Sequence, residues 1–102
     1  MDEQMQAAED ARTQQVILRL AAMSDKWERV QQAILDELLL AVSHYNSMAN
    51  PHDGWARIRE EVDELWDEVK TREQPIERMR AEAIQVGAMA MRFILDVCGG
   101  MQ

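Results

Sequence analysis

Apolar residues recur at steps of three and four along most of the chain, which is the spacing of one face of an α-helix. Over residues 26–48 this stripe consists of Trp27, Val30, Ile34, Leu38, Ala41, Tyr45 and Met48. Over residues 55–69 it consists of Trp55, Ile58, Val62, Leu65 and Val69, with Trp66 beside it. Because residues that favour helices (Ala, Leu, Met, Glu, Gln and Arg) also dominate the composition, the chain is predicted to be all-α.

Capping residues and helix breakers divide this pattern into about four helices. Ser24 and Asp25 can cap a new helix, and Glu28 follows Asp25 at the spacing of a capping box. These residues predict helices over about 3–23 and 26–48, with one continuous helix kinked near Ser24 as the alternative.

The segment from Asn50 to Gly54 is the strongest break in the chain, because Pro51 cannot continue a helix. Asp53 is placed to cap the helix that follows, and this third helix is expected to run to about Thr71.

The last predicted helix has Pro75 in its first turn and ends at Gly99 and Gly100, which are residue types typical of helix starts and ends. This helix is apolar nearly all round. Its one polar stripe consists of Glu82, Gln85, Arg92 and Asp96, with the apolar Met89 among them. Such a helix belongs at the centre of a bundle, and three amphipathic helices from one short chain do not supply enough cover. We therefore expect one domain over residues 1–102, a helical bundle of about four helices completed by a homodimer or a tetramer.

Charge and cysteine content narrow the range of partners. The net charge of -8 opposes direct binding to DNA or RNA, whose affinity depends on Lys and Arg neutralising phosphates. The one cysteine, Cys98, cannot form an intrachain disulfide, fits a reducing compartment, and is expected to be buried or inert. The start MDEQMQ resembles no signal peptide, and no apolar run approaches the roughly 18 residues of a membrane span. We expect a soluble, cytoplasmic protein with no nucleic-acid or membrane partner.

Residues 60–68, EEVDELWDE, hold six carboxylates and no Lys or Arg. Their like-charge pairs at helical spacing cost on the order of 1 to 3 kcal/mol together, which solvent, basic neighbours or a bound cation must relieve. If the last two helices form a hairpin that turns near Glu73, equal rise per residue brings Glu64 level with Glu82, and Glu61 level with Gln85. Facing carboxylates are ligands that Mg²⁺ or Mn²⁺ prefers, so the pattern predicts a metal site, with a solvated acidic face as the alternative.

The motif Glu60-Glu61-x-x-Glu64, followed after a spacer by Glu82-x-x-Gln85, resembles the EExxE and ExxD motifs of the MazG-like nucleoside triphosphate pyrophosphohydrolases. The resemblance covers about residues 51–97. It implies an all-α dimer or tetramer that uses Mg²⁺ to split nucleoside triphosphates into monophosphate and pyrophosphate.

The resemblance also implies roles for individual residues. Glu61, Glu64 and Glu82 would be metal ligands, and Glu60 and Glu61 the catalytic carboxylates, with Glu60 as a further ligand or as the base that orients water. Gln85 stands where the family motif has an aspartate and would be the fourth metal ligand, although its amide oxygen carries no charge. The acids that could replace the missing charge are Asp67, Glu68 and Asp96.

Basic and aromatic residues nearby have two interpretations each. Lys70 and Arg78, near the expected turn, could hold a triphosphate, although ion pairs with neighbouring acids are favoured. Trp27, Trp55 and Trp66 could stack on a base, although core packing is favoured.

The leading hypothesis is a Mg²⁺- or Mn²⁺-dependent nucleoside triphosphate pyrophosphohydrolase. One alternative is a catalytically inactive helical module that binds nucleotides or another protein. The other is a helical adaptor whose acidic face docks on a basic partner.

Overall fold

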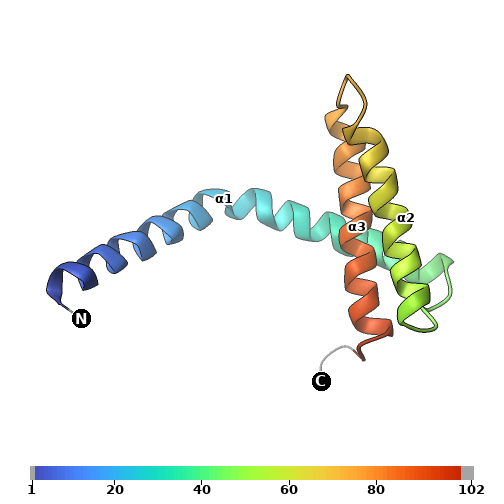
Figure 1. The fold of residues 1–102 in the computed structure, drawn as a ribbon, viewed down its shortest axis with the longest axis horizontal. Coiled ribbons are helices and arrows are strands. Elements are labelled where there is room, and N and C mark those ends of the chain that lie inside the picture. Colours follow the sequence, from blue (N-terminus) through green and yellow to red (C-terminus); the bar gives the residue numbers. More distant parts are fainter. Residues whose placement is uncertain (1, 100–102) are drawn as a thin grey trace. The chain divides into compact units, whose positions relative to one another are not determined.

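The structure, a computed structural model, describes residues 2–99, and all regular secondary structure within that range is helical. The three helices are α1 (Glu3–His44), α2 (Pro51–Val69) and α3 (Ile76–Asp96) (Figure 1). The prediction of an all-α protein is confirmed. Among the described residues, no helix combines the length and the apolarity that crossing a bilayer requires.

The predicted helix boundary at Ser24 and Asp25 is wrong, because α1 continues through both residues. The alternative of one continuous helix is therefore the observed one, and the described chain has three helices instead of four. No Gly or Pro occurs between Glu3 and His44, while Ser and Asp inside a helix cost only about 0.7 kcal/mol each or less.

The chain divides into two compact units, residues 1–31 and residues 32–102. Taken by itself, the first unit is one helical stretch, the N-terminal part of α1. The second unit contains the end of α1 together with α2 and α3, and it holds the core and the candidate site. One domain over residues 1–102 stays a prediction.

Two side-chain hydrogen bonds fix the start of α2 in a variant of the capping box, in which the return bond goes to the residue before the N-cap. The N-cap is Asn50, whose side chain accepts from the backbone N–H of Asp53 at 2.8 Å, and Asp53 in turn accepts from the N–H of Ala49 at 2.8 Å. The prediction that Asp53 is the N-cap is therefore wrong, because Asp53 is the third residue of the helix. The helix ends at Val69, two residues before the expected end.

A short turn at Gln74, which adopts a positive φ of 46°, reverses the chain so that α2 and α3 lie side by side and antiparallel (Figure 1). Close packing between them requires Gly54, because a Cβ at this position would lie 2.5 Å from Phe93 Cδ2. Near the middle of α3, Gly87 similarly leaves room for Ile34 of α1. The buried apolar core of the chain is small and consists of Leu38, Ala41, Met48 and Ala88.

Two charged residues of α3 determine where α1 ends. Arg92, only 3% exposed, donates to the carbonyl oxygens of Ala41 at 2.6 Å and Tyr45 at 2.7 Å, and Asp96 accepts from the N–H of Met48 at 2.9 Å. The bond from Met48 N–H uses a backbone group that a helix continued to residue 48 would need, whereas Ala41 O still accepts the helical N–H of Tyr45 at 2.9 Å. The helix α1 ends at His44 instead of near residue 48. The last helix also ends early, at Asp96; Gly100 lies outside the described residues.

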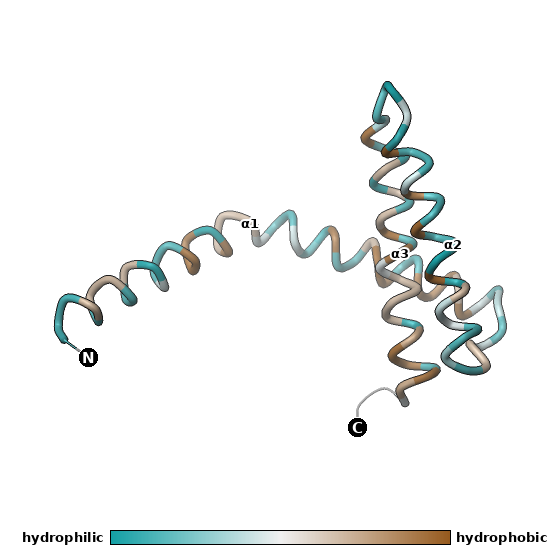
Figure 2. Tube along the Cα trace, viewed as in Figure 1, coloured by the Kyte–Doolittle hydropathy of each residue, from teal (hydrophilic) through white to brown (hydrophobic). Residues whose placement is uncertain are grey.

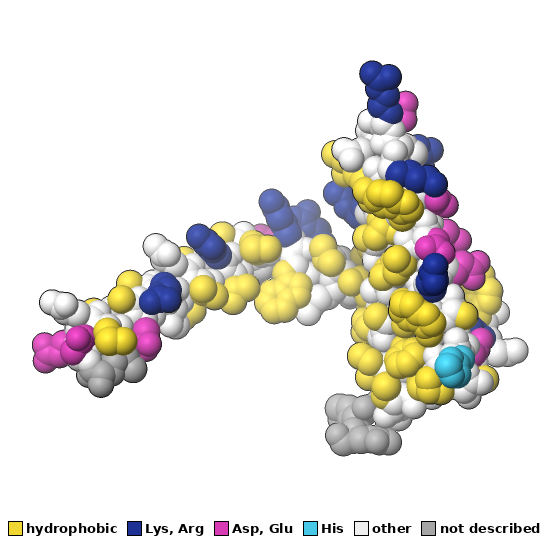
Figure 3. Space-filling view, in the orientation of Figure 1, with side chains coloured by type: hydrophobic (Ala, Val, Ile, Leu, Met, Phe, Trp, Pro, Cys, Tyr) yellow, Lys and Arg dark blue, Asp and Glu magenta, His cyan; other side chains and the backbone are white. Residues whose placement is uncertain are grey.

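The prediction that the tryptophans pack in the core is wrong for this chain. Trp27, Trp55 and Trp66 are each more than half exposed. On α2 the apolar stripe is wider than the contact with α3, so Ile58 is half-buried while Trp55 is not. Figure 2 shows that much of α3 is made of hydrophobic residues, and the yellow side chains in Figure 3 show that part of them lies on the surface. Cys98 is exposed too, which corrects the expectation of burial.

Candidate metal centre

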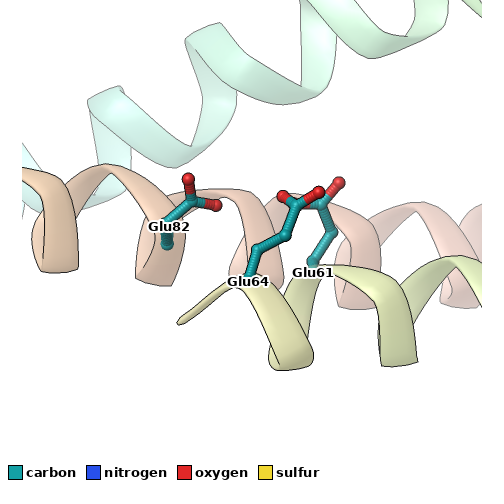
Figure 4. Close-up of side chains that lie close together, drawn as sticks. All are labelled: Glu61, Glu64 and Glu82. Atoms are coloured by element: carbon teal, nitrogen blue, oxygen red, sulfur yellow. The ribbon is translucent and has the colours of Figure 1, made fainter. Parts of the chain in front are cut away.

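Three carboxylates from two helices converge in the second unit. Glu61 and Glu64 project from α2, Glu82 projects from α3, and each offers an oxygen within 4.8 Å of the other two (Figure 4). The sequence expectation that Glu64 and Glu82 come level across the hairpin agrees with this arrangement. That these residues hold a metal ion stays a prediction.

Helix geometry explains the convergence. Glu61 and Glu64 are three positions apart, so they share one face of α2. The turn between Val69 and Ile76 is short enough to keep α3 against that face, and this places Glu82 opposite Glu64. Half of the site is thus set by local helical spacing and half by the register of the hairpin.

The site raises the pKa of two of its carboxyl groups. Burial, followed by the charge and hydrogen bond of Glu64, raises the pKa of Glu61 from 4.5 to about 7. Burial and the same neighbour also raise the pKa of Glu82, with a smaller contribution from Glu68. Within the described chain, the Oε2 atoms of Glu61 and Glu82 are buried without a hydrogen-bond partner. The site therefore holds acceptor capacity and negative charge that its own residues do not neutralise.

These features fit a hard divalent cation. Mg²⁺ and Mn²⁺ take carboxylate oxygens as ligands, and a cation between the three groups would supply the missing partner of both buried oxygens. A simple solvated acidic face, the alternative to a metal site, explains buried unpaired oxygens less well, because water satisfies exposed carboxylates.

Glu60 and Gln85 lie beside the cluster and line a pocket of about 550 Å³. Glu61 belongs to the cluster and to this pocket, so the two are adjacent. The other walls include Tyr45 and Asn46, from the segment after α1. Neither residue was predicted to belong to a site, and the only sequence signal was the place of Tyr45 near the end of an apolar stripe.

The substitute ligands and the phosphate-binding candidates are paired with one another. Lys70 Nζ lies 3.1 Å from Asp67, and Arg78 Nε lies 3.0 Å from Glu68 Oε2, although the second contact lacks the geometry of a hydrogen bond. This is the favoured interpretation of the basic residues. Three of the four side chains are largely exposed, and only Glu68 is partly buried.

Asp96, the third substitute ligand, has a structural role. It accepts from Met48 N–H and from Arg92 Nε, both at 2.9 Å, and these partners lower its pKa, the Met48 bond contributing most. Arg92 lies on the predicted polar stripe of the last helix, but its contacts with the end of α1 were not predicted.

No protein-family model matches this chain, and neither a curated protein nor a solved structure matches it at a significant level. The similarity to the MazG-like pyrophosphohydrolases therefore rests on the two acidic motifs, and membership of that family stays an expectation.

Proposed function

We propose that the protein is a Mg²⁺- or Mn²⁺-dependent nucleoside triphosphate pyrophosphohydrolase that converts nucleoside triphosphates to monophosphates and pyrophosphate. The observation that carries the proposal is the convergence of Glu61, Glu64 and Glu82, two of which present buried oxygens without a partner. A site that concentrates negative charge in this way attracts a divalent cation, and a bound divalent cation can coordinate an anionic phosphate chain.

Glu61, Glu64 and Glu82 would hold the metal. When bound, the ion neutralises phosphate charge and lowers the pKa of a water molecule that serves as nucleophile. Glu60, which lines the pocket next to Glu61, is the candidate carboxylate for orienting that water and accepting its proton. A triphosphate that uses Lys70 or Arg78 must displace Asp67 or Glu68 from its ion pair.

A second copy of the chain is part of the proposal. On α2, Trp55, Val62 and Trp66 share one face and are exposed, and on α3 Ile94 and Leu95 are more than half exposed. Pairing two copies through these faces would remove apolar area from water at about 25 cal/mol per Å². Sedimentation should therefore report a dimer or tetramer, and Ile94→Glu with Leu95→Glu should shift it towards monomer; a monomeric wild-type protein would refute this part.

Pyrophosphate release tests the enzymatic proposal. Purified protein is incubated with natural and modified nucleoside triphosphates, with Mg²⁺ or Mn²⁺, and pyrophosphate is measured. We expect turnover of at least one substrate, with a loss of roughly a hundredfold or more in Glu64→Gln and Glu82→Gln, since each removes a charged ligand. The matched control is Glu77→Gln. Glu77 is an exposed acid on the same helix as Glu82, and it pairs with Arg80. No release from any triphosphate would refute the proposal.

A catalytically inactive nucleotide-binding or protein-interaction module is the second candidate, and the neutral Gln85 in the position of the motif aspartate favours it. This candidate predicts no pyrophosphate release and little stabilisation by Mn²⁺. A specific metal site should instead raise the melting midpoint as RT ln(1 + [L]/Kd), about 2.7 kcal/mol at a concentration of 100 Kd.

A further inference from the structure

The pocket next to the carboxylates has walls from four parts of the second unit: the end of α1, the segment after it, α2 and α3. Tyr45 and Asn46 come from the segment after α1, Glu61 from α2, and Gln85 and Met89 from α3. Its volume of about 550 Å³ lies in the range of roughly 300 to 1,000 Å³ that is typical of sites for small organic ligands.

Two arginines hold the wall after α1 in place. Arg92 donates to the carbonyl oxygen of Tyr45 at 2.7 Å, and Arg57 donates to that of Asn46 at 2.8 Å. Arg92 is itself bonded to Asp96, so this side of the pocket is organised before a ligand arrives. A preorganised wall lowers the entropy cost of binding.

The chemistry of the lining distinguishes between parts of a nucleotide. The carboxylates of Glu37, Glu60 and Glu61 disfavour an anion. The two lining arginines are already engaged, Arg57 by Asn46 O and Asp53 and Arg92 by backbone carbonyls and Asp96. Several of the other lining groups suit a flat, uncharged ring with polar edges. An aromatic ring and a thioether offer apolar contact, while the amides of Asn46 and Gln85 each carry donors and an acceptor.

We propose that this pocket binds the nucleoside part of the nucleotide, and that Gln85 reads the edge of the base instead of serving as a metal ligand. Because Glu61 is shared with the carboxylate cluster, a nucleoside in the pocket has its phosphates directed to Glu61, Glu64 and Glu82. The inference rests on the proposed function for the identity of the ligand. The proposal also explains why position 85 holds a neutral amide. An amide can both donate to and accept from the edge of a base, whereas a carboxylate can only accept hydrogen bonds.

The test separates the two sites by using uncharged nucleosides in EDTA, so that turnover, metal and phosphate charge play no part. Saturation-transfer NMR with the four ribonucleosides and the four deoxyribonucleosides should show transfer to base protons for at least one of them. Gln85→Leu should weaken that binding about tenfold, because the base edge loses its partner. The affinity of the Gln85→Leu protein for Mn²⁺, measured by calorimetry, should differ from wild type by less than about twofold. Loss of a true metal ligand would lower that affinity much more. Gln15→Leu, the same change at an exposed position of the first unit, should alter neither quantity.

Three results would overturn the inference. One is the absence of binding by every nucleoside, and another is unchanged nucleoside binding in Gln85→Leu. The third is a Gln85→Leu protein that loses Mn²⁺ affinity while it keeps nucleoside binding. If circular dichroism shows that Gln85→Leu does not fold, Asn46→Leu at an exposed position replaces it, and unchanged nucleoside binding in that variant overturns the inference equally.

The outcomes are independent of the enzymatic test. Nucleoside binding without pyrophosphate release from any triphosphate would refute the proposed function and leave the proposal for the pocket intact. Release that continues with unchanged base preference in Gln85→Leu would refute the pocket and leave the enzyme standing.

Discussion

Glu64 and Glu82 belong to different helices, yet their carboxylates offer oxygens within 4.8 Å of one another, with Glu61 as the third member of the group. Like charges so close destabilise the folded chain unless a proton or a cation lies between them. The free energy of unfolding should therefore respond to substitution in opposite directions with and without a divalent ion.

Glu64→Gln is expected to stabilise the metal-free protein and to abolish its stabilisation by metal. Without metal, removing the repulsion with Glu61 and Glu82 should add about 0.5 to 1 kcal/mol, or roughly 2 to 6 °C in Tm. With excess Mn²⁺ the order should reverse, because the variant lacks one ligand. Thermal melts in EDTA and in Mn²⁺ measure both effects, with Glu73→Gln, an exposed acid in the turn, as the control for net charge. The same order of stability in both buffers would contradict a metal site.

Stability without metal should also fall as pH rises through the neutral range. The pKa of Glu61 is about 7 in the folded protein against 4.5 as its ordinary value, so the folded state holds more protons than the unfolded state between these limits. The contribution is complete below pH 4.5 and is lost as pH passes through 7. Allowing for solvent screening of a half-buried group, the loss is about 1 kcal/mol, and the raised pKa of Glu82 acts in the same direction.

Urea melts in EDTA at several pH values above 4.5 measure this loss. The lower limit matters because Asp96, whose pKa is lowered from 3.8, has the opposite effect in more acidic solution. Glu61→Gln should flatten the dependence, since it removes the titrating group. A wild-type profile that rises or stays level between about pH 5 and 7.5 would contradict the electrostatic account.

Arg92→Met should destabilise the second unit strongly. The side chain is buried and donates to Ala41, Tyr45 and Asp96, so its loss leaves two carbonyl groups and a carboxylate without their charged partner. We expect a decrease of about 3 kcal/mol or more in the free energy of unfolding. Arg80→Met removes an exposed ion pair of the same helix and should cost less than about 1 kcal/mol. Chemical denaturation of both variants compares them directly, and equal effects would show that burial of Arg92 contributes little.

These residues also mark the limit of what sequence could predict. The approach of Glu64 to Glu82 follows from counting equal rise on both sides of a turn, which needs no knowledge of side-chain packing. That count does not fix the rotation of each helix about its axis, so the sequence could not predict that Gln85 lines the pocket. The contacts of Arg92 were hidden for another reason, because its partners on α1 are backbone carbonyls, which every residue has.

The error at Ser24 and Asp25 has a different cause. A capping box is defined by a spacing that also occurs inside continuous helices, and only a competing break in the backbone makes it a terminus. At Asn50 that break is present, because Pro51 follows, and the helix start was predicted correctly to within a few residues. Breakers were thus the reliable signal, and capping residues alone were not.

Gly54→Ala should destabilise the contact between α2 and α3, whereas Gly87→Ala should cost little. A Cβ at position 54 would lie 2.5 Å from Phe93 Cδ2 and 2.8 Å from Cε2, both atoms of a rigid ring, so the helices must separate at a cost of about 1 to 3 kcal/mol. At position 87 the nearest atom is the flexible end of Ile34 at 3.2 Å, and the helix propensity of Ala returns up to about 1 kcal/mol. Denaturation measures both variants, and Phe93→Leu should partly relieve the effect of Gly54→Ala because it removes the ring. Additive effects in that double variant would contradict a direct clash and place the cost of Gly54→Ala elsewhere.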